Sequence, residues 1–361
     1  MTSSRRAKVL SWLLGLDLIG ESVLIEGYEV DVEGVKKWIR ENEVKRVLVQ
    51  APPGLRGVRR KLIDEISGEL DMVFVHGGGC WGGCDLAVAH AKAVGADAII
   101  HLGHARFLEK SPIPTFYLEC RKTDPAPILA ALEKSAKILQ GHHKIGVGVT
   151  IQWQGSLSPV RKKLEEYGVE ALTGPPIPPL RYESQVLGCG YEPLLRLSEE
   201  VECYLIVGSK FHGLGLALQT EKTVYSLDPE LQRLDDLSAE VEKLLRSRYG
   251  YIEMFRRADE VGVVVSVKPG QYRMGAAVKL RETLRKAGKR AEILIMDDVE
   301  VNLLRDSGFE GFVNMACPRL SIEDQQALDK PLLLPMEALI AVGAAEWGEV
   351  IRTPRYFLME V

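Results

Sequence analysis

The sequence predicts an α/β protein made of three repeated parallel-sheet units, and three observations support this fold class. Short apolar runs of strand length alternate with amphipathic segments of helical period along most of the chain. The order of strand, loop, helix and strand recurs three times, at intervals of roughly 100 residues. In each repeat, a loop that follows a predicted strand carries a cysteine. We therefore expect three domains, at residues 1–125 (with an N-terminal extension), 126–232 and 233–361 (opening with a linking helix).

The composition is that of a soluble globular protein. Of the 361 residues, 46% are hydrophobic and 27% are charged, and the net charge of −4 does not favour nucleic acid or an anionic membrane as a partner. The apolar run 9–20 is interrupted by Asp17 and is not followed by a signal-peptide cleavage site. Six irregularly spaced cysteines are too few for a disulfide scaffold. We expect a cytoplasmic protein with reduced thiols and no membrane contact.

The strands are expected where apolar runs end in glycine or polar residues, and the helices where the apolar period is about 3.6 residues. In the first repeat, strands are expected at 46–50, 72–75, 98–101 and 115–118, with helices at about 32–40, before Ile66 and after Cys84. In the second, strands are expected at 144–152, 169–172 and 203–207, with helices at 159–167 and after Cys189. In the third, strands are expected at 261–267, 291–296 and 311–315, with a helix at 276–287; the amphipathic stretch 234–255 precedes it.

Cys84, Cys189 and Cys317 each fall in a loop that we place at the carboxyl ends of the strands, where open α/β sheets bind their ligands. If the three repeats pack around a common axis, the three thiols converge on a central site. An iron–sulfur cluster held by three cysteines keeps one iron open for a substrate, which is the arrangement that activates S-adenosylmethionine. Cys120 and Cys203 adjoin strands and are expected to be buried small hydrophobes.

A zinc site is the alternative to a cluster. Cys80, Cys84, His101 and His104 have the spacing C-x3-C-x16-H-x2-H, which is close to that of a zinc finger. The two histidines, however, end a predicted strand of a large domain that does not need a metal to fold. The compact C-x3-C-x2-C signature of ordinary radical enzymes is incomplete, because residue 87 is alanine.

From about residue 45 to the end, several short motifs follow one another in a fixed order. They are VQAPPGL (49–55), WGGCDLA (81–87), GADAIIHLGH (95–104), LGCG (187–190), KFHGLGLAL (210–218), YSLDP (225–229), ACPRLSIED (316–324) and KPLLLPMEA (330–338). In this order they resemble the diphthamide-synthesis family, the archaeal 2-(3-amino-3-carboxypropyl)histidine synthases and their eukaryotic paralogues. ACPRLSIED is specific by itself, whereas the others are weak individually.

The resemblance implies three domains of one α/β fold, a homodimer, and a [4Fe–4S] cluster with Cys84, Cys189 and Cys317 as ligands. It implies reductive cleavage of S-adenosylmethionine, with electrons from an external donor, to a 3-amino-3-carboxypropyl radical and methylthioadenosine. The radical then adds to the imidazole C2 of a histidine in translation elongation factor 2. Cys80 stands where the family more often has another residue. The C-terminus is shorter than in eukaryotic relatives, which favours the archaeal, self-sufficient form.

Polar residues at the expected strand ends are candidates for contacts to S-adenosylmethionine. They are Gln50, His101, His104, Gln152, His212 and Arg319. Arg319 could pair with the methionine carboxylate or tune the cluster, and Asp85 is expected to cap the helix that follows it. The sequence indicates no catalytic residue beyond the cluster ligands.

Two other functions fit part of the pattern. A quinolinate-synthase-like dehydratase is also triplicated, holds one cluster with one cysteine per domain, and would use the open iron as a Lewis acid on a small substrate. A paralogue without activity of its own could hold a cluster to pass electrons or to support a partner subunit. Retention of all three cysteines argues against such a degenerate copy.

Overall fold

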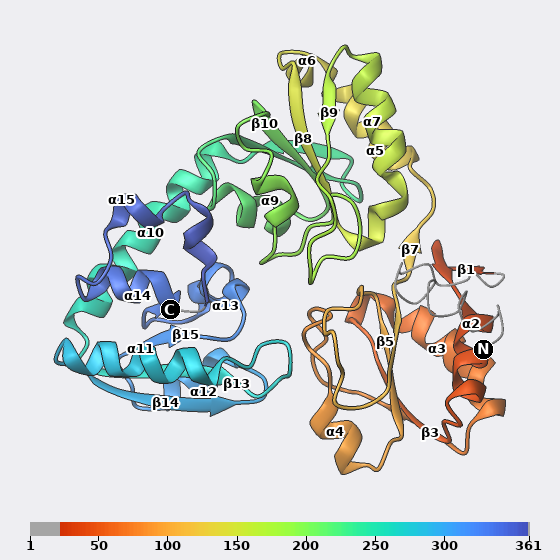
Figure 1. The fold of residues 1–361 in the computed structure, drawn as a ribbon, viewed down its shortest axis with the longest axis horizontal. Coiled ribbons are helices and arrows are strands. Elements are labelled where there is room, and N and C mark those ends of the chain that lie inside the picture. The colour runs from red at the N-terminus through yellow and green to blue at the C-terminus, as the bar shows by residue number, and fades with distance from the viewer. Residues whose placement is uncertain (1–21, 360–361) are drawn as a thin grey trace, which may run out of the picture. The chain divides into compact units, whose positions relative to one another are not determined.

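The computed structural model describes residues 22–359, so the apolar run 9–20 lies outside the described residues (Figure 1). The chain divides into two compact units. Unit 1 is the described part of Met1–Asp124 together with Ile177–Arg181, and unit 2 comprises Pro125–Pro176 and Tyr182–Val361.

Unit 1 contains one four-stranded parallel sheet in the order β4-β3-β5-β6. Its strands are β3 (Arg46–Gln50), β4 (Met72–Val75), β5 (Ala98–Leu102) and β6 (Thr115–Leu118). Its helices are α2 (Val32–Glu41), α3 (Arg56–Ile66) and α4 (Val88–Ala93), with short 3₁₀ turns at Pro53–Leu55 and Ser67–Glu69. A small antiparallel sheet joins β1 (Val23–Ile25), β2 (Tyr28–Val30) and β7 (Arg121–Lys122).

Unit 2 contains two sheets, of which the first has the order β12-β11-β10-β8-β9. Its strands are β8 (Lys144–Val149), β9 (Glu170–Leu172), β10 (Cys203–Val207), β11 (Thr223–Asp228) and β12 (Arg233–Asp236), and only β12 is antiparallel to its neighbour. Its helices are α5 (Ala126–Lys134), α6 (Ala136–Leu139), α7 (Leu157–Glu166), α8 (Glu192–Leu195) and α9 (Lys210–Ala217).

The other sheet of unit 2 is parallel and has the order β14-β13-β15-β16. Its strands are β13 (Glu260–Ser266), β14 (Arg290–Met296), β15 (Gly311–Asn314) and β16 (Leu332–Leu333). Its helices are α10 (Ser238–Arg257), α11 (Met274–Lys286), α12 (Val301–Asp306), α13 (Pro318–Ile322), α14 (Pro335–Ala341) and α15 (Trp347–Val350), with 3₁₀ turns at Asp324–Ala327 and Pro354–Phe357.

The three parallel sheets share one strand order. In each, the first strand along the chain lies between the second and the third, and the fourth lies beyond the third. This recurrence, with helices between the strands, confirms the predicted α/β class with several parallel sheets. The predicted boundary at residues 232 and 233 cuts through the second sheet, because β12 continues it to Asp236.

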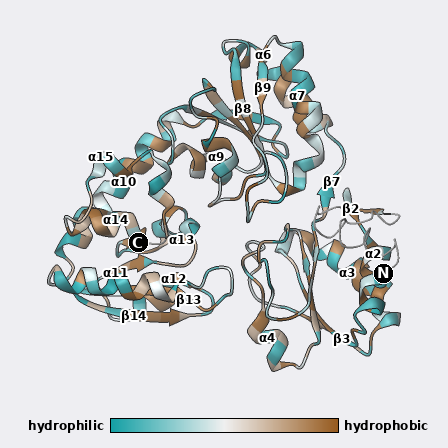
Figure 2. Cartoon of the chain, viewed as in Figure 1, coloured by the Kyte–Doolittle hydropathy of each residue, from teal (hydrophilic) through white to brown (hydrophobic). Residues whose placement is uncertain are grey.

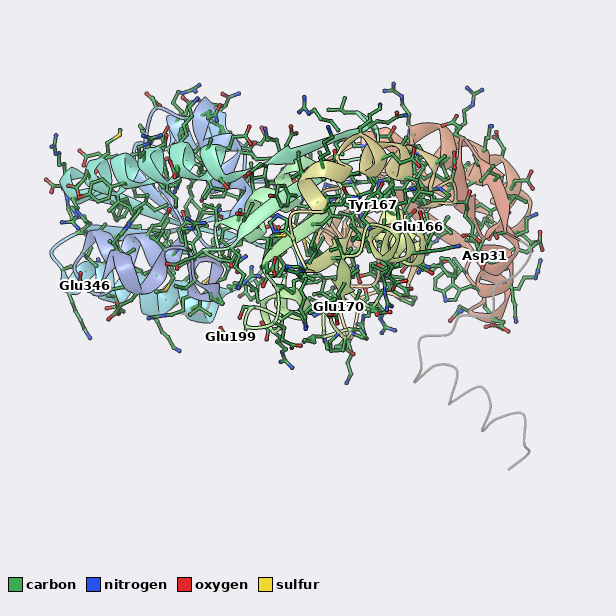
Figure 3. All side chains as sticks on the ribbon, turned by 90° about the horizontal axis from the view of Figure 1, so that it is seen from above. Asp31, Glu166, Tyr167, Glu170, Glu199 and Glu346 are labelled. Carbon is green, nitrogen blue, oxygen red and sulfur yellow. The ribbon has the colours of Figure 1, made fainter. Side chains whose placement is uncertain are left out.

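Helix α2 forms where an apolar stripe and an N-terminal capping residue coincide. The Asp31 carboxylate, labelled in Figure 3, accepts a hydrogen bond of 2.7 Å from the backbone N–H of Gly34 and so caps α2. Helix α2 buries Val32, Val35 and Ile39 and leaves its charged residues outside. Figure 2 shows the same alternation of hydrophobic and hydrophilic residues along α11. Burial of these stripes holds the helices on the sheets.

Three predicted elements differ from the structure. The strand expected at 144–152 ends at Val149, and a 3₁₀ helix (Ile151–Ser156) follows, so Gln152 lies in that helix. The loop expected after β10 contains the start of α9, which places His212 in the first turn of a helix. The amphipathic stretch 234–255 begins with β12, and α10 starts only at Ser238.

A buried ion pair fastens α10 to the C-terminal part of unit 2. The side chains of Arg248 and Glu337 are both fully buried and hydrogen-bonded to each other, with 2.8 Å between Arg248 Nε and Glu337 Oε1. The Tyr356 hydroxyl donates to the same carboxylate at 2.5 Å. The guanidinium also donates to the carbonyl oxygens of Ser321 (2.7 Å) and Leu332 (2.9 Å). These bonds anchor α13, which directly follows Cys317.

No helix in the described part of the chain is both long and apolar enough to span a bilayer.

Candidate functional site

In unit 1, Gln50 at the carboxyl end of β3 organises the loop that carries Cys84. The amide is buried, and its Nε2 donates to the carbonyl oxygens of Asp85 (2.7 Å) and Gly79 (3.4 Å). Its Oε1 accepts from the backbone N–H of Ala87 (3.0 Å) and lies 3.2 Å from His101 Nδ1. One side chain therefore ties both halves of the loop to the end of β5.

Asp85 makes a hydrogen bond within the same loop. The prediction that it caps the following helix is wrong. Its carboxylate accepts a hydrogen bond of 3.1 Å from the backbone N–H of Trp81. Helix α4 begins two residues later than a cap at Asp85 would allow, with Ala87 at the N-cap and no side-chain cap. The buried carboxylate shapes a turn around Cys84, whose thiol is partly exposed.

Two glycines allow close packing in this part of unit 1, one in the Cys84 loop and one after β5. A Cβ at Gly83 would lie 2.5 Å from the carbonyl oxygen of Ala105 and 3.1 Å from Phe107 Cβ. Gly103, directly after β5, has a φ of +84°, and a Cβ there would lie 2.7 Å from a Leu55 methyl group. Only glycine fits both places without displacing the chain.

His101 and His104 lie together at the carboxyl end of β5, and Cys80 adjoins them. His101 Nε2 is 2.9 Å from His104 Nδ1 and 3.9 Å from Cys80 Sγ. Burial lowers the pKa of His101 well below its usual value, and the neighbouring His104 and His76 lower it further. The His101 ring is therefore neutral at physiological pH. The fourth residue with zinc-finger spacing, Cys84, is not a member of this group.

In unit 2, the structure brings Cys189 and Cys317 close enough to influence each other electrostatically. Burial raises the pKa of the Cys317 thiol to about 12, and the nearby Cys189 contributes to the rise. The backbone and charge of Arg319 and the charge of Arg273 act in the opposite direction. Cys189 itself is exposed, in the loop between β9 and α8. Two neighbouring thiols, one of them exposed, fit a soft metal centre, which would stabilise their thiolates.

The Cys317 loop is fixed by hydrogen bonds to its backbone. Asn314, buried at the end of β15, donates to the carbonyl oxygen of Cys317 at 2.7 Å and accepts from the backbone N–H of Ala316 at 2.9 Å. Arg273, at the start of α11, donates to the carbonyl oxygen of Ala316 at 3.0 Å. These contacts hold the backbone on both sides of the cysteine, so the thiol has a defined position.

Arg319 lies near Cys317, and His212 lies near Arg319. Arg319 pairs with Glu323, and its guanidinium carbon lies 5.6 Å from the centre of the Phe211 ring. His212 Nδ1 lies 2.8 Å from Ser209 Oγ. Burial lowers the pKa of His212 to about 4, a hydrogen bond to Ser209 opposes this shift, and the charge of Arg319 adds to it. His212 thus lies at a helix start and not at the strand end where it was expected.

The three proposed ligands do not occupy three corresponding loops. Cys84 and Cys189 each follow the second strand of their sheet, whereas Cys317 follows the third strand of its sheet. All three nevertheless lie at carboxyl edges, as predicted. Cys120 and Cys203 are buried, also as predicted, and burial raises the pKa of each thiol to about 12. Gln152 lies after β8 at the same kind of edge, in a 3₁₀ helix.

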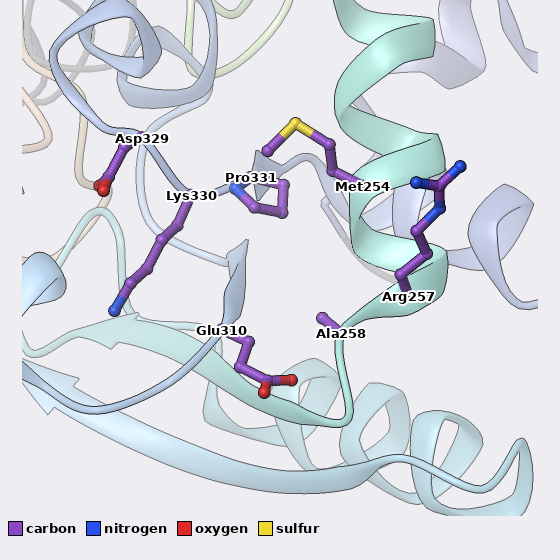
Figure 4. A pocket seen from close by; sticks show the side chains of 7 residues that line it. All are labelled: Met254, Arg257, Ala258, Glu310, Asp329, Lys330 and Pro331. Atoms are coloured by element: carbon purple, nitrogen blue, oxygen red, sulfur yellow. The ribbon is translucent and has the colours of Figure 1, made fainter.

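A surface pocket of about 240 Å³ lies elsewhere in unit 2 (Figure 4). It is lined by Met254, Arg257, Ala258, Glu310, Asp329, Lys330 and Pro331. Three of these residues lie just before strands: Ala258 before β13, Glu310 before β15 and Pro331 before β16. The pocket therefore lies at the edge of the sheet where its strands begin. Ligands of open α/β sheets bind at the opposite edge, where Cys317 lies.

The fold and the cysteine loops define an α/β protein with thiol donors at the carboxyl edges of repeated parallel sheets. Comparison with known proteins identifies the family. Residues 51–352 match the model of the family described as putative diphthamide synthesis protein, and the chain belongs to this family.

The relatives share most of their length with this chain. It is 33% identical over 332 residues to the 2-(3-amino-3-carboxypropyl)histidine synthase of Pyrococcus horikoshii, covering 91% of this chain and 95% of the relative. The synthase subunit 1 of Schizosaccharomyces pombe is 26% identical over 340 residues, covering 91% of this chain and 77% of the relative. The crystal structure of Dph2 from Pyrococcus horikoshii with a 4Fe-4S cluster matches with a TM-score of 0.80 and 32% identity, over 88% of this chain and 92% of that one. The predicted family resemblance is thereby confirmed.

Proposed function

We propose that this protein transfers the 3-amino-3-carboxypropyl group of S-adenosylmethionine to a histidine of translation elongation factor 2, the first step of diphthamide biosynthesis. The observation that carries the proposal is the pair Cys189 and Cys317, brought together at carboxyl edges in unit 2 of a chain of this family. Relatives that match about nine tenths of this chain are named as the synthase or its subunit 1. This match favours the transferase over a quinolinate-synthase-like dehydratase.

Cys84, Cys189 and Cys317 are the proposed ligands of a [4Fe–4S] cluster. Thiolates are the usual ligands of such clusters, and a solved relative is described with one. When bound, the cluster supplies the electron that cleaves S-adenosylmethionine by a radical route. An imidazole C2 carbon is a poor nucleophile, which calls for radical rather than acid–base chemistry.

The protein side chains bind and orient. Arg319 presents a positive charge near Cys317, which suits the methionine carboxylate, and the neutral His212 ring beside it offers a donor or acceptor to the same molecule. Gln50 holds the Cys84 loop through its amide. Direct contacts of Gln50, His101, His104 and Gln152 with S-adenosylmethionine stay predictions.

The experiment is to measure iron and acid-labile sulfide, and the EPR spectrum after dithionite, on anaerobically purified protein. The variants Cys84→Ala, Cys189→Ala and Cys317→Ala are compared with Cys120→Ser. Cys120 is buried, and its Sγ lies 3.4 Å from the Leu118 carbonyl oxygen, a contact that serine can keep. We expect about four irons per chain in the parent and in Cys120→Ser, and loss in the other three variants. Unchanged iron content in the three cysteine variants would overturn the assignment of these residues as ligands.

Activity is tested with reduced protein, S-adenosylmethionine and archaeal elongation factor 2. Methylthioadenosine should form, and the factor should gain the mass of one aminocarboxypropyl group. A loaded cluster without either product would favour a supporting subunit instead. We further propose a homodimer, an external electron donor in the cytoplasm, and no membrane or nucleic-acid partner. Light scattering of the purified chain measures the dimer directly.

A further inference from the structure

Unit 1 contains a second set of metal-ligating groups that uses none of the three proposed cluster cysteines. Cys80 Sγ and one ring nitrogen each of His101 and His104 all lie within 4.8 Å of one another. Cys80 and His101 are buried, and His104 is partly exposed. Thiolate with imidazole is a donor set for zinc or another late first-row metal, not for magnesium or calcium.

Gln50 sets the tautomer of His101. Because its Nε2 faces the carbonyl oxygens of Asp85 and Gly79, its Oε1 is the atom that faces His101 Nδ1 at 3.2 Å. An amide oxygen only accepts, so Nδ1 carries the hydrogen and donates it. The neutral ring therefore directs the lone pair of Nε2 toward His104 and Cys80. Metal-binding histidines are held by such a second hydrogen bond in most metalloproteins.

The distances suit a tetrahedral ion. With metal–nitrogen bonds of about 2.05 Å and a metal–sulfur bond of about 2.3 Å, tetrahedral geometry requires about 3.3 Å between nitrogens and about 3.5 Å between nitrogen and sulfur. The corresponding separations are 2.9 Å from His101 Nε2 to His104 Nδ1 and 3.9 Å from His101 Nε2 to Cys80 Sγ. Side-chain shifts of about 0.4 Å bring these two separations to their tetrahedral values, and Cys80 Sγ lies within 4.8 Å of a His104 ring nitrogen.

We propose that Cys80, His101 and His104 form a mononuclear Zn²⁺ site, with Gln50 holding His101 from behind. Three protein ligands leave a fourth position for water or another small donor. The ion fastens the loop that precedes Cys84 to the end of β5, so it supports the position of that cysteine. The proposal is independent of the cluster, since it needs neither Cys189 nor Cys317.

The test uses the full chain with Cys84, Cys189 and Cys317 all replaced by serine, which removes every proposed cluster ligand. Metal-free protein is titrated with Zn²⁺ in competition with a chromophoric chelator, and separately with Co²⁺. We expect one equivalent of Zn²⁺, and for Co²⁺ the visible bands of tetrahedral coordination with a thiolate charge-transfer band. Cys80→Ser in this background should remove the charge-transfer band and weaken Zn²⁺ binding at least about tenfold, and Gln50→Ala should weaken it about 10–100-fold.

Cys120→Ser is the matched control, because Cys120 is as buried as Cys80 and lies in the same unit. It should leave both titrations unchanged. If Cys80→Ser does not fold, His104→Gln decides, because this partly exposed side chain can be changed without opening the core. Absence of stoichiometric Zn²⁺ binding, or binding that survives both Cys80→Ser and His104→Gln, would overturn the site.

Discussion

The buried pair of Arg248 and Glu337 gives a sharp test of how unit 2 holds the segment after Cys317. The substitution Glu337→Gln keeps the shape of the side chain but removes its charge. Glu337 accepts two hydrogen bonds from Arg248, one from the Tyr356 hydroxyl and one from the backbone N–H of Leu334. The amide nitrogen cannot accept, so half of these donors lose their acceptor. The guanidinium then stays buried without a counter-charge.

Removing one partner of a buried ion pair costs about 3–5 kcal/mol. With an m-value of about 3 kcal/mol per molar, the urea midpoint of unit 2 should fall by about 1–1.7 M. Hydrogen exchange in α13 and α14 reports this unit specifically, and it should accelerate with the same free-energy change. Glu242→Gln, an exposed residue on the same helix as Arg248, should stay within about 0.5 kcal/mol of the parent.

The double variant Arg248→Met with Glu337→Leu removes both charges and keeps most of the volume, so no buried charge remains without a partner. It also leaves the Tyr356 hydroxyl, the Leu334 N–H and the Ser321 and Leu332 carbonyl oxygens without these partners, so we expect it to stay less stable than the parent. A loss below about 1 kcal/mol in Glu337→Gln would refute the reasoning.

Three further predictions concern the site. Gly83→Ala should lower the iron bound per chain, measured by an iron assay, and destabilise unit 1 by about 1–3 kcal/mol, measured by urea titration. Gly77→Ala is the control and should change neither quantity, because a Cβ at Gly77 meets nothing within 4 Å. Asn314→Ala should cost about 1–3 kcal/mol by leaving buried groups of the Cys317 loop unpaired, and the loss of iron should exceed the loss of helix measured by circular dichroism. The folded-state pKa of His212, about 4, is below its usual 6.5, so the unfolded chain binds the proton first and stability falls as the pH drops from 6.5 toward 4. His212→Asn should flatten this fall by at most about 1.4 kcal/mol per pH unit, and equal slopes in parent and variant would contradict the shift.

The elements that sequence predicted best are those whose signal is local. Strands β3, β4, β6 and β10 have the predicted bounds, because each is a short apolar run ended by polar or glycine residues. The spacing of apolar residues does not predict the element correctly where the same residues fit both a helix and a strand. Leu234 and Leu237 suit a helix, yet Leu234 lies in β12, and Ile151 continues the apolar run of β8 although it already belongs to a 3₁₀ helix.

The loops that carry Cys84, Cys189 and Cys317 could be predicted from the sequence, and the residues that support these loops could not. A thiol in a loop after a strand is visible in the sequence. The roles of Gln50 and Asn314 are not, because their hydrogen bonds join loops that meet only in the folded sheet. The Ser209 that precedes α9 is a residue type typical of helix starts, and this signal could have placed His212 correctly. The burial of Arg248 could not be predicted from the sequence, since this residue lies among many other charged residues of a long amphipathic helix.

The shared strand order of the three sheets is what repeated duplication of one ancestral gene segment leaves behind. Such copies inherit the scaffold but not the identity of the loop that carries a functional side chain. Cys317 lies in a different crossover from the one that carries Cys84 and Cys189, at the same edge of its sheet. Aligning the three repeats by their cysteines would therefore misalign their strands, so the correspondence between the repeats follows from strand order and not from the positions of the cysteines.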